Sequence, residues 1–306
     1  FGISFTFGPL NQAGCLVNIY KDGSVLASHS GVDMGQGLNT KLAQIVASTL
    51  RVPIESVRID ATATNKVPNT SPTAASSGTD LNGWALFNAC TELNQRLEKY
   101  RTPNRTFAEA VVAAYLDKVD LSAHGFYATP NIVWNWDTGK GRPFAYYTYG
   151  AGAAQVEIDL LTGDHVVNRA DIVYDVGRSI NPAIDIGQIE GGFLQGYGLV
   201  TMEELIRGDN YRNKWVKPGY LHSNQIAYYK VPGFNDIPTE FNVSILPGSK
   251  NKQGVYSSKA IGEPPLLLAN CVALAIKDAI KSSRIENGLD ETFELRYPLT
   301  SDKIKV

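Results

Sequence analysis

The first pattern of apolar and polar positions along the chain predicts a β-hairpin. Residues 16–20 and 24–28 are short runs of strand-forming residues separated by Lys21-Asp22-Gly23, where the glycine supplies the positive φ of a tight turn. The period then changes to that of a helix, for which Asn39 or Thr40 can serve as the N-cap. Four apolar residues fall on one face of this helix: Leu42, Ile45, Val46 and Leu50. A further strand is predicted at residues 57–61.

The remainder of the chain repeats this alternation of strands and helices. A loop of small polar residues at 69–78 leads into a helix whose inward face carries Leu86, Ala89, Leu93 and Leu97. A second hairpin is predicted at residues 154–160 and 165–173. The next helix is expected to begin at Asn181-Pro182 and to run through Gln188, Phe193 and Leu199. The last major helix is expected to begin at Pro264-Pro265, where missing N–H groups cost nothing, and to end near Ile280.

Two hairpins that each lead into single helices predict an α+β fold. Residues 125–152 are rich in Gly, Pro and aromatic residues and show no clean period. We therefore predict two mixed α/β subdomains, at residues 1–140 and 141–306. The chain begins with Phe1 inside a strand-like run and lacks an initiator Met, so we expect a fragment of a longer protein.

Composition excludes several classes of function. The net charge is −2 and no run of Lys and Arg exceeds two residues, so nothing indicates binding to nucleic acid or to an anionic membrane. The longest apolar stretch, residues 264–276, is too short to span a bilayer. Three widely spaced cysteines form no C-x-x-C pair, which predicts buried thiols in a reducing compartment: Cys15, Cys90 and Cys271. We expect a cytosolic protein, with the peroxisome as the alternative.

Glycosylation is not expected, although Asn69, Asn104 and Asn242 each begin an N-x-S/T triplet. No other feature indicates secretion. A glycan on Asn69 would also obstruct the loop at residues 69–78.

Glu263 is the first candidate for chemistry. It lies between Gly262, which permits close approach of another group, and Pro264-Pro265, which begins a helix. The apolar run at residues 266–268 is expected to remove water from the carboxylate and to favour its action as a general base. The alternative is a plain acidic residue favoured by the dipole at a helix N-terminus.

Three loops at predicted helix starts could hold a ligand. Gly35-Gln36-Gly37 can bring backbone N–H groups close to an anion, although it lacks the pattern of a nucleotide-binding loop and also fits a structural turn. Residues 72–78 offer small side chains and hydroxyls to a flat or phosphorylated ligand, or simply cap a helix. Residues 185–196 are dense in glycine, which indicates either close helix packing or a ligand.

Other catalytic classes find little support. The four histidines have no metal-ligand spacing, and neither H-E-x-x-H nor G-x-S-x-G occurs. Zinc and serine hydrolases are therefore disfavoured.

Taken together, these segments resemble the xanthine dehydrogenases and, more broadly, the molybdenum hydroxylases. The matching stretches follow the family's order over nearly the whole chain, at residues 1–6, 22–26, 34–38, 71–76, 157–159, 161–165, 181–191 and 259–266. Each alone is weak, but the set is highly specific.

The resemblance implies a cofactor and a reaction. Family members bind molybdenum on a molybdopterin and hydroxylate an electron-poor carbon with water-derived oxygen, and Glu263 matches the glutamate that accepts the proton. Cofactor contacts are implied for Gly35, Gln36, Gly37, Ala75, Ser76 and Gln188, with Ala75 near the metal but not a side-chain ligand. Phe5 and Thr6 match residues of the purine pocket, whereas Phe7-Gly8-Pro9 departs from the bulkier apolar residues usual there.

The resemblance also implies parts that this sequence lacks. Complete members carry FAD and two [2Fe–2S] clusters, transfer electrons to NAD or oxygen, and form homodimers. No cysteine cluster or flavin region is visible here. We predict oxidation of hypoxanthine and xanthine to urate by the complete enzyme. Two alternatives stay open, namely an aldehyde oxidase-type hydroxylase and a catalytically inactive fragment that serves only as a structural or subunit-contact module.

Overall fold

The computed structural model describes residues 1–3 and 10–305. The chain divides into two compact units. Unit 1 contains residues 1–148, 176–185 and 247–262, and unit 2 contains residues 149–175, 186–246 and 263–306. The predicted division at 140/141 is a single cut, whereas unit 1 also takes two later segments of the chain.

Unit 1 is built on a four-stranded sheet of order β4-β3-β2-β5. The predicted first hairpin is confirmed as β2 (Gln12–Ile19) and β3 (Val25–His29), which are antiparallel, and Gly23 has a φ of 84° in the turn. β5 (Ser122–Ala128) pairs with β2 antiparallel and β4 (Val57–Ile59) pairs with β3 parallel. Alternate residues of β2 are buried, which orients one face of the sheet toward the core: Ala13, Cys15, Val17 and Ile19.

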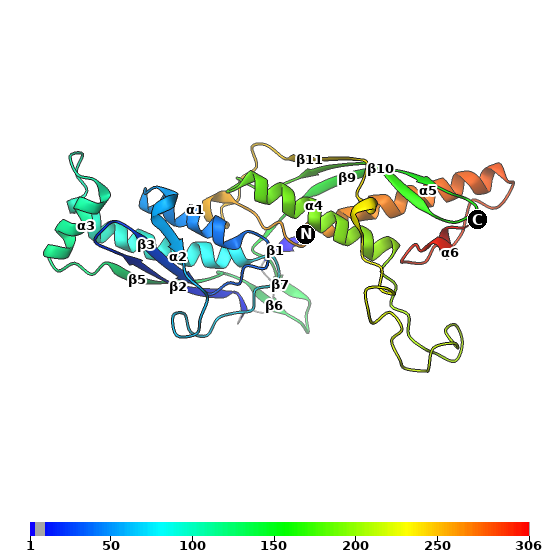
Figure 1. Cartoon of the computed structure of the whole chain (residues 1–306), viewed down its shortest axis with the longest axis horizontal. Coiled ribbons are helices and arrows are strands. Elements are labelled where there is room, and N and C mark those ends of the chain that lie inside the picture. Colours follow the sequence, from blue (N-terminus) through cyan, green and yellow to red (C-terminus); the bar gives the residue numbers. More distant parts are fainter. Residues whose placement is uncertain (4–9, 306) are drawn as a thin grey trace. The chain divides into compact units, whose positions relative to one another are not determined.

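Two helices pack on this face of the sheet, α1 (Leu38–Leu50) and α2 (Gly78–Leu97) (Figure 1). The predicted inward residues of both helices are fully buried. The predicted start of α1 is wrong by two or three residues, because Gly37 rather than Asn39 or Thr40 occupies the N-cap. α3 (Phe107–Leu116) follows a 3-10 turn at Glu98–Tyr100 and begins with a capping box between Thr106 and Glu109.

Short elements complete unit 1. A 3-10 turn at Ile54–Ser56 precedes β4, and β6 (Val133–Asn135) and β7 (Lys140–Arg142) form a small hairpin. β1 (Gly2–Ile3) pairs antiparallel with β8 (Tyr146–Tyr147), and a 3-10 turn covers Val255–Ser257. β1 therefore anchors the chain just before the predicted pocket residues Phe5 and Thr6, which lie outside the described residues.

Unit 2 repeats the plan of a hairpin with one added parallel strand. β9 (Gly150–Ile158) and β10 (His165–Tyr174) are antiparallel, as predicted, and β11 (Glu240–Ile245) joins β10 in parallel. The glycine-rich helix α4 (Pro182–Thr201) begins at the end of unit 1, and a 3-10 turn at Phe234–Asp236 precedes β11.

The C-terminal elements correct one prediction. Pro264-Pro265 begins a 3-10 helix, η6 (Pro264–Ala269), and the α-helix proper is α5 (Asn270–Glu286), which ends beyond the expected Ile280. α5 lies along β9 in Figure 1, and α6 (Ser301–Ile304) closes the chain. The α+β prediction is confirmed. Within the described part of the chain, no helix is long and apolar enough to cross a membrane.

Candidate functional site

The Gly-Gln-Gly loop between β3 and α1 is closed by its own glutamine. The Gln36 side-chain Nε2 donates to the Val32 carbonyl at 2.9 Å, and its Oε1 accepts from the Met34 N–H at 2.5 Å. The side chain that the resemblance assigns to the cofactor thus also determines the shape of the loop.

Asp33 occupies the N-terminal end of α1. Its carboxylate accepts from the N–H of Gly35 and from the N–H of Asn39, each at 3.0 Å. This explains why α1 begins without a side-chain cap of its own, since an acidic residue six positions earlier satisfies a first-turn donor. A carboxylate of the protein therefore already satisfies two N–H groups at this helix end, and the contact of this loop with a cofactor stays a prediction.

The second loop, residues 71–77, has a strained backbone. Ala75 and Ser76 have φ values of 55° and 54°, which side-chain-bearing residues adopt at a cost of about 1–2 kcal/mol each. Consecutive residues in such conformations can form a concave group of N–H donors that suits anionic oxygens. The Val32 N–H donates to Thr73 Oγ1 at 2.9 Å and joins this loop to the Gly-Gln-Gly loop.

A third segment, residues 255–262, meets the second loop at Gly262. A Cβ atom added to Gly262 would lie 3.0 Å from Ser76 Oγ, a tight contact, so the glycine backbone and the Ser76 side chain are close neighbours. The segment is also strained, with φ values of 50° and 67° at Tyr256 and Ser257. Two strained pairs of residues thus belong to the two segments that meet here, and strain of this kind gathers at functional sites. Glu263 follows directly.

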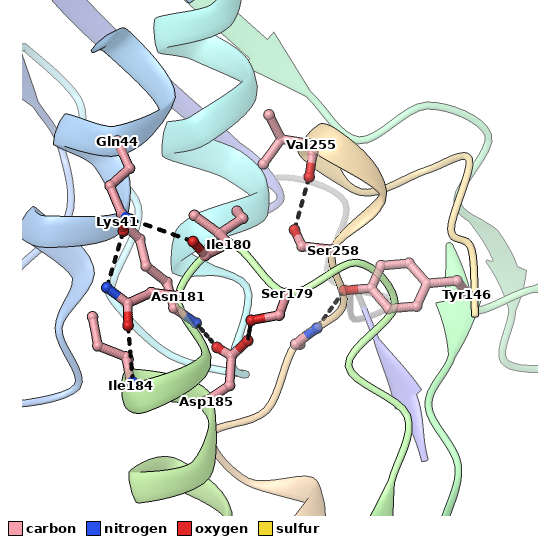
Figure 2. A network of polar contacts seen from close by, with 11 residues as sticks. Lys41, Gln44, Tyr146, Ser179, Ile180, Asn181, Ile184, Asp185, Val255 and Ser258 are labelled. Atoms are coloured by element: carbon pink, nitrogen blue, oxygen red, sulfur yellow. Dashed lines mark hydrogen bonds and ion pairs between the residues drawn. The ribbon is translucent and has the colours of Figure 1, made fainter. Parts of the chain in front are cut away.

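Several hydrogen bonds hold the third segment in unit 1, among them those of Lys259 and Ala260. The Lys259 N–H donates to the Val176 carbonyl at 2.8 Å. The Ala260 N–H donates to the hydroxyl of Tyr146 at 2.9 Å, the bond that ends on the Tyr146 hydroxyl in Figure 2. The Tyr146 hydroxyl itself donates to Asp80 Oδ2 at 2.5 Å. Tyr146 therefore links the first turn of α2 to the residues that precede Glu263.

Asp80 belongs to a small group of buried charges. Burial raises the pKa of the Asp80 carboxyl to about 7, although the Tyr146 hydroxyl and the charge of Lys41 act in the opposite direction. Lys41 Nζ lies 2.5 Å from Asp185 Oδ1, and Ser179 Oγ donates to the same carboxylate at 2.6 Å (Figure 2). Because Lys41 forms its ion pair with Asp185, Asp80 is, among the described residues, the second carboxyl group of a cluster with one cation.

Glu263 itself is exposed in this chain, and Leu267 of the following run is 52% exposed. The expectation that residues 266–268 shield the carboxylate is therefore wrong for the chain as it stands. These leucines lie in η6, whose 3-10 geometry directs them differently from the α-helix that the sequence suggested. Within unit 2, the Leu266 carbonyl packs against Gly196 of α4, so closely that a Cβ there would collide with it.

Gln188 lies on α4 one turn after Ile184, which packs against Gly37. Its convergence with Gln36 and Ser76 stays a prediction, as do the roles of Phe5 and Thr6. Of the glycines in this helix, Gly196 fits the close-packing interpretation, whereas a Cβ at Gly187 or Gly191 would meet nothing within 4 Å.

The site fits a metal that is held through an organic cofactor. Among residues 1–3 and 10–305, no group of three or more His, Cys, Asp and Glu side chains could hold a metal ion by itself. The donors that the loops offer are backbone amides, hydroxyls and carboxamides, which suit the polar edge and oxygens of such a molecule.

Sequence reasoning missed Asp80, Tyr146 and Lys41. Asp80 in the first turn of a helix has the signature of a dipole-stabilising surface residue, and Tyr146 lies in a region without a clear period. No spacing rule connects them, because the contacts join residues 66, 114 and 144 positions apart. For the loop around position 75, the available signals were its density of small residues and the family resemblance.

Comparison with known proteins gives a matching family and similar proteins. The family model described as "Molybdopterin cofactor-binding domain" matches residues 1–238. A xanthine dehydrogenase of Oryza sativa subsp. japonica is 52% identical, and one of Drosophila pseudoobscura pseudoobscura is 54% identical. Each alignment covers 100% of this chain and 22% of the relative, so the chain spans about a fifth of those proteins.

Solved structures of similar fold are more distant in sequence. Quinoline 2-oxidoreductase from Pseudomonas putida 86 has a TM-score of 0.79 at 24% identity, over 99% of this chain and 40% of that one. The aldehyde oxidoreductase from Desulfovibrio desulfuricans has a TM-score of 0.77 at 23% identity, over 99% of this chain and 31% of that one.

Proposed function

Because this chain belongs to the molybdopterin cofactor-binding domain family, we propose that it forms part of the cofactor site of a molybdenum hydroxylase that oxidises purines. The names of its relatives support xanthine as the substrate, and we propose hypoxanthine as the second. FAD, two [2Fe–2S] clusters, a homodimeric assembly and the final acceptor, NAD or oxygen, belong to the proposed complete enzyme. An aldehyde substrate is the alternative for the same chemistry.

One observation carries the proposal. Gly262 lies against Ser76, so the strained Ala75–Ser76 loop and the backbone that ends at Gly262 are neighbours in unit 1, and Glu263 is the next residue of the chain. A carboxylate placed one residue beyond such a contact is well placed to serve a ligand on that loop. An isolated acidic residue at a helix start would need no such approach.

The roles of the chain's residues follow from this arrangement. The backbone amides of Ala75 and Ser76, with Gln36 and Gln188, would hold the cofactor, which supplies the metal centre that accepts electrons from the substrate. Glu263 accepts a proton from the water-derived nucleophile. Because Glu263 is exposed in this chain, we propose that the remaining domains, the cofactor and the substrate together exclude water from it.

The test is Glu263→Gln in the complete enzyme, loaded with molybdenum and sulfurated. Glutamine preserves size and hydrogen bonding but cannot accept the proton. General-base catalysis contributes about 10²–10⁴ in rate, and we expect a loss of xanthine turnover at the top of that range with the molybdenum content unchanged. Glu55→Gln, a change at another exposed glutamate in a short 3-10 turn, is the matched control and should leave turnover unchanged.

A near-normal kcat for Glu263→Gln would remove Glu263 from the mechanism. Molybdenum analysis of the 306-residue chain alone separates a working half-site, with about one metal per chain, from an inactive structural module with none. Steady-state rates with xanthine and with an aldehyde decide the substrate class.

A further inference from the structure

Tyr146 joins two parts of unit 1 that are otherwise distant in sequence. It lies on β8, whose partner β1 directly precedes residues 4–9, and its hydroxyl contacts both Asp80 on α2 and the Ala260 backbone. The hydroxyl donates its only proton to Asp80 at 2.5 Å and accepts from the Ala260 N–H at 2.9 Å. Both bonds have good length, and Asp80 and Ala260 are buried.

We propose that Tyr146 is a positioning residue for the Glu263 segment, and that the charge of Asp80 determines how firmly the Tyr146 hydroxyl holds the Ala260 backbone. The link to catalysis rests on the proposed function, because it takes Glu263 as the base three residues further on. The hydrogen-bond chain itself does not depend on that role.

The physical basis is the strength of charge-assisted hydrogen bonds. A hydrogen bond to an ionised carboxylate is roughly twice as strong as a neutral one, and chains of such bonds polarise one another. When Asp80 is ionised, the hydroxyl oxygen of Tyr146 becomes a better acceptor for the Ala260 N–H. When Asp80 binds a proton, this assistance is lost and the segment is held less firmly.

The surroundings of Asp80 place this change near neutral pH. Among the described residues, Lys41 of α1 and Tyr146 of β8 act on Asp80, Asp185 pairs with Lys41, and Tyr127 of β5 lies near the Asp80 charge. Burial, opposed by Tyr146 and Lys41, leaves the pKa of Asp80 at about 7. Burial and the nearby Asp80 charge raise the pKa of the Tyr127 phenol, so Tyr127 stays neutral across this range.

Hydrogen exchange of the Ala260 amide tests the proposal without relying on activity. The experiment uses the complete enzyme, with mass-spectrometric resolution of the residues around 260 and correction for the intrinsic pH dependence of exchange. In the unsubstituted protein, protection of the Ala260 amide should rise by about fivefold between pH 6 and pH 8. In Tyr146→Phe it should fall by about tenfold and become independent of pH.

Two further variants complete the design. Asp80→Asn keeps the size of the side chain but removes the charge. The protection of the Ala260 amide against hydrogen exchange should therefore be the same at pH 6 and pH 8 in this variant. Tyr100→Phe is the matched control, because Tyr100 is also buried and its hydroxyl also donates to an aspartate, Asp117, at 2.9 Å. It should leave the exchange of Ala260 unchanged.

The outcomes separate this inference from the proposed function. Normal Ala260 protection in Tyr146→Phe, or a pH-independent amide in the unsubstituted protein, overturns the positioning role whatever Glu263 does. If Glu263 is the base, Tyr146→Phe should also lower kcat for xanthine about tenfold with little change in KM. Lost protection with a normal kcat would mean that Tyr146 holds the segment but does not position a base.

Discussion

Asp80 lies in the first turn of α2, where the helix dipole favours a carboxylate, yet burial works against its charge. Its pKa in the folded protein is about 7, above the ordinary value of 3.8. The folded state therefore binds more protons than the unfolded state between these two values. The free energy of unfolding therefore changes with pH in the direction opposite to that for an aspartate in a salt bridge. The contribution of Asp80 to stability is full at low pH and is lost as the pH rises toward 7.

Asp80→Asn should expose this effect directly. The asparagine carries no charge at any pH. The free energy of unfolding of the variant, minus that of the unsubstituted protein, should therefore increase as the pH rises. The gain should approach about 1 kcal/mol per pH unit between pH 5 and pH 7 and level off above pH 7. Urea denaturation at pH 5, 6, 7 and 8 measures it. A constant difference between the two proteins would show that Asp80 is ionised throughout.

At the scale of elements, two glycines of α4 differ in their surroundings: one is closely packed and the other has free space where a Cβ would lie. Gly196 is buried against the Leu266 carbonyl of η6, the turn that follows Glu263. Gly187, two turns earlier in the same helix, is exposed and would accept a Cβ without a contact. α4 therefore holds η6 through a close approach at Gly196, which steadies the residues immediately after the proposed base.

Substituting these two glycines should give opposite effects on stability. Gly196→Ala drives a methyl group into backbone, and we expect a loss of about 1–3 kcal/mol together with reduced turnover. Gly187→Ala replaces a poor helix former at an exposed position of the helix and should raise stability by up to about 1 kcal/mol. Chemical denaturation of both variants checks this. Equal effects at the two positions would contradict the packing role of Gly196.

The elements themselves were largely predictable from local pattern. Alternation in residues 16–28 and helical spacing from Leu86 to Leu97 report burial on one face, which is a local property of the chain. The start of α1 was not, because its N-cap is Gly37 and a first-turn N–H is satisfied by Asp33, which lies outside the helical pattern. The 3-10 geometry of η6 could not be predicted either, since two prolines can begin an α-helix or a 3-10 helix.

The candidate site was predictable only where its residues lie in recognisable segments. Ala75, Ser76 and Glu263 were identified through loops and through the family resemblance. Asp80 and Tyr146 were not, since each owes its role to tertiary contacts with a distant part of the chain.

On the scale of the whole molecule, unit 1 is assembled from three separate stretches of chain. Residues 176–185 return to the first stretch and pair with α1 through several polar contacts (Figure 2). Asn181 Nδ2 donates to Gln44 Oε1 at 3.2 Å, and the buried pair of Lys41 and Asp185 closes the group. The Lys41 and Asp185 side chains are 10% and 2% exposed, so water cannot take the place of the partner if one of the two charges is removed.

Removing one member of this pair should therefore be more harmful than removing both. A buried charge left without its partner costs about 3–5 kcal/mol, whereas an apolar pair of similar volume is often tolerated. We expect Lys41→Met to lose stability in that range, and Lys41→Met combined with Asp185→Leu to lose less than the single change, although Ser179 then lacks its acceptor. Lys281→Met is the control, because its pair with Glu291 is exposed and should contribute less than about 1 kcal/mol. Urea midpoints of the three variants measure these differences, and a double variant less stable than Lys41→Met would contradict the expectation, because the unpaired Asp185 charge would then not be the main cost of the single change.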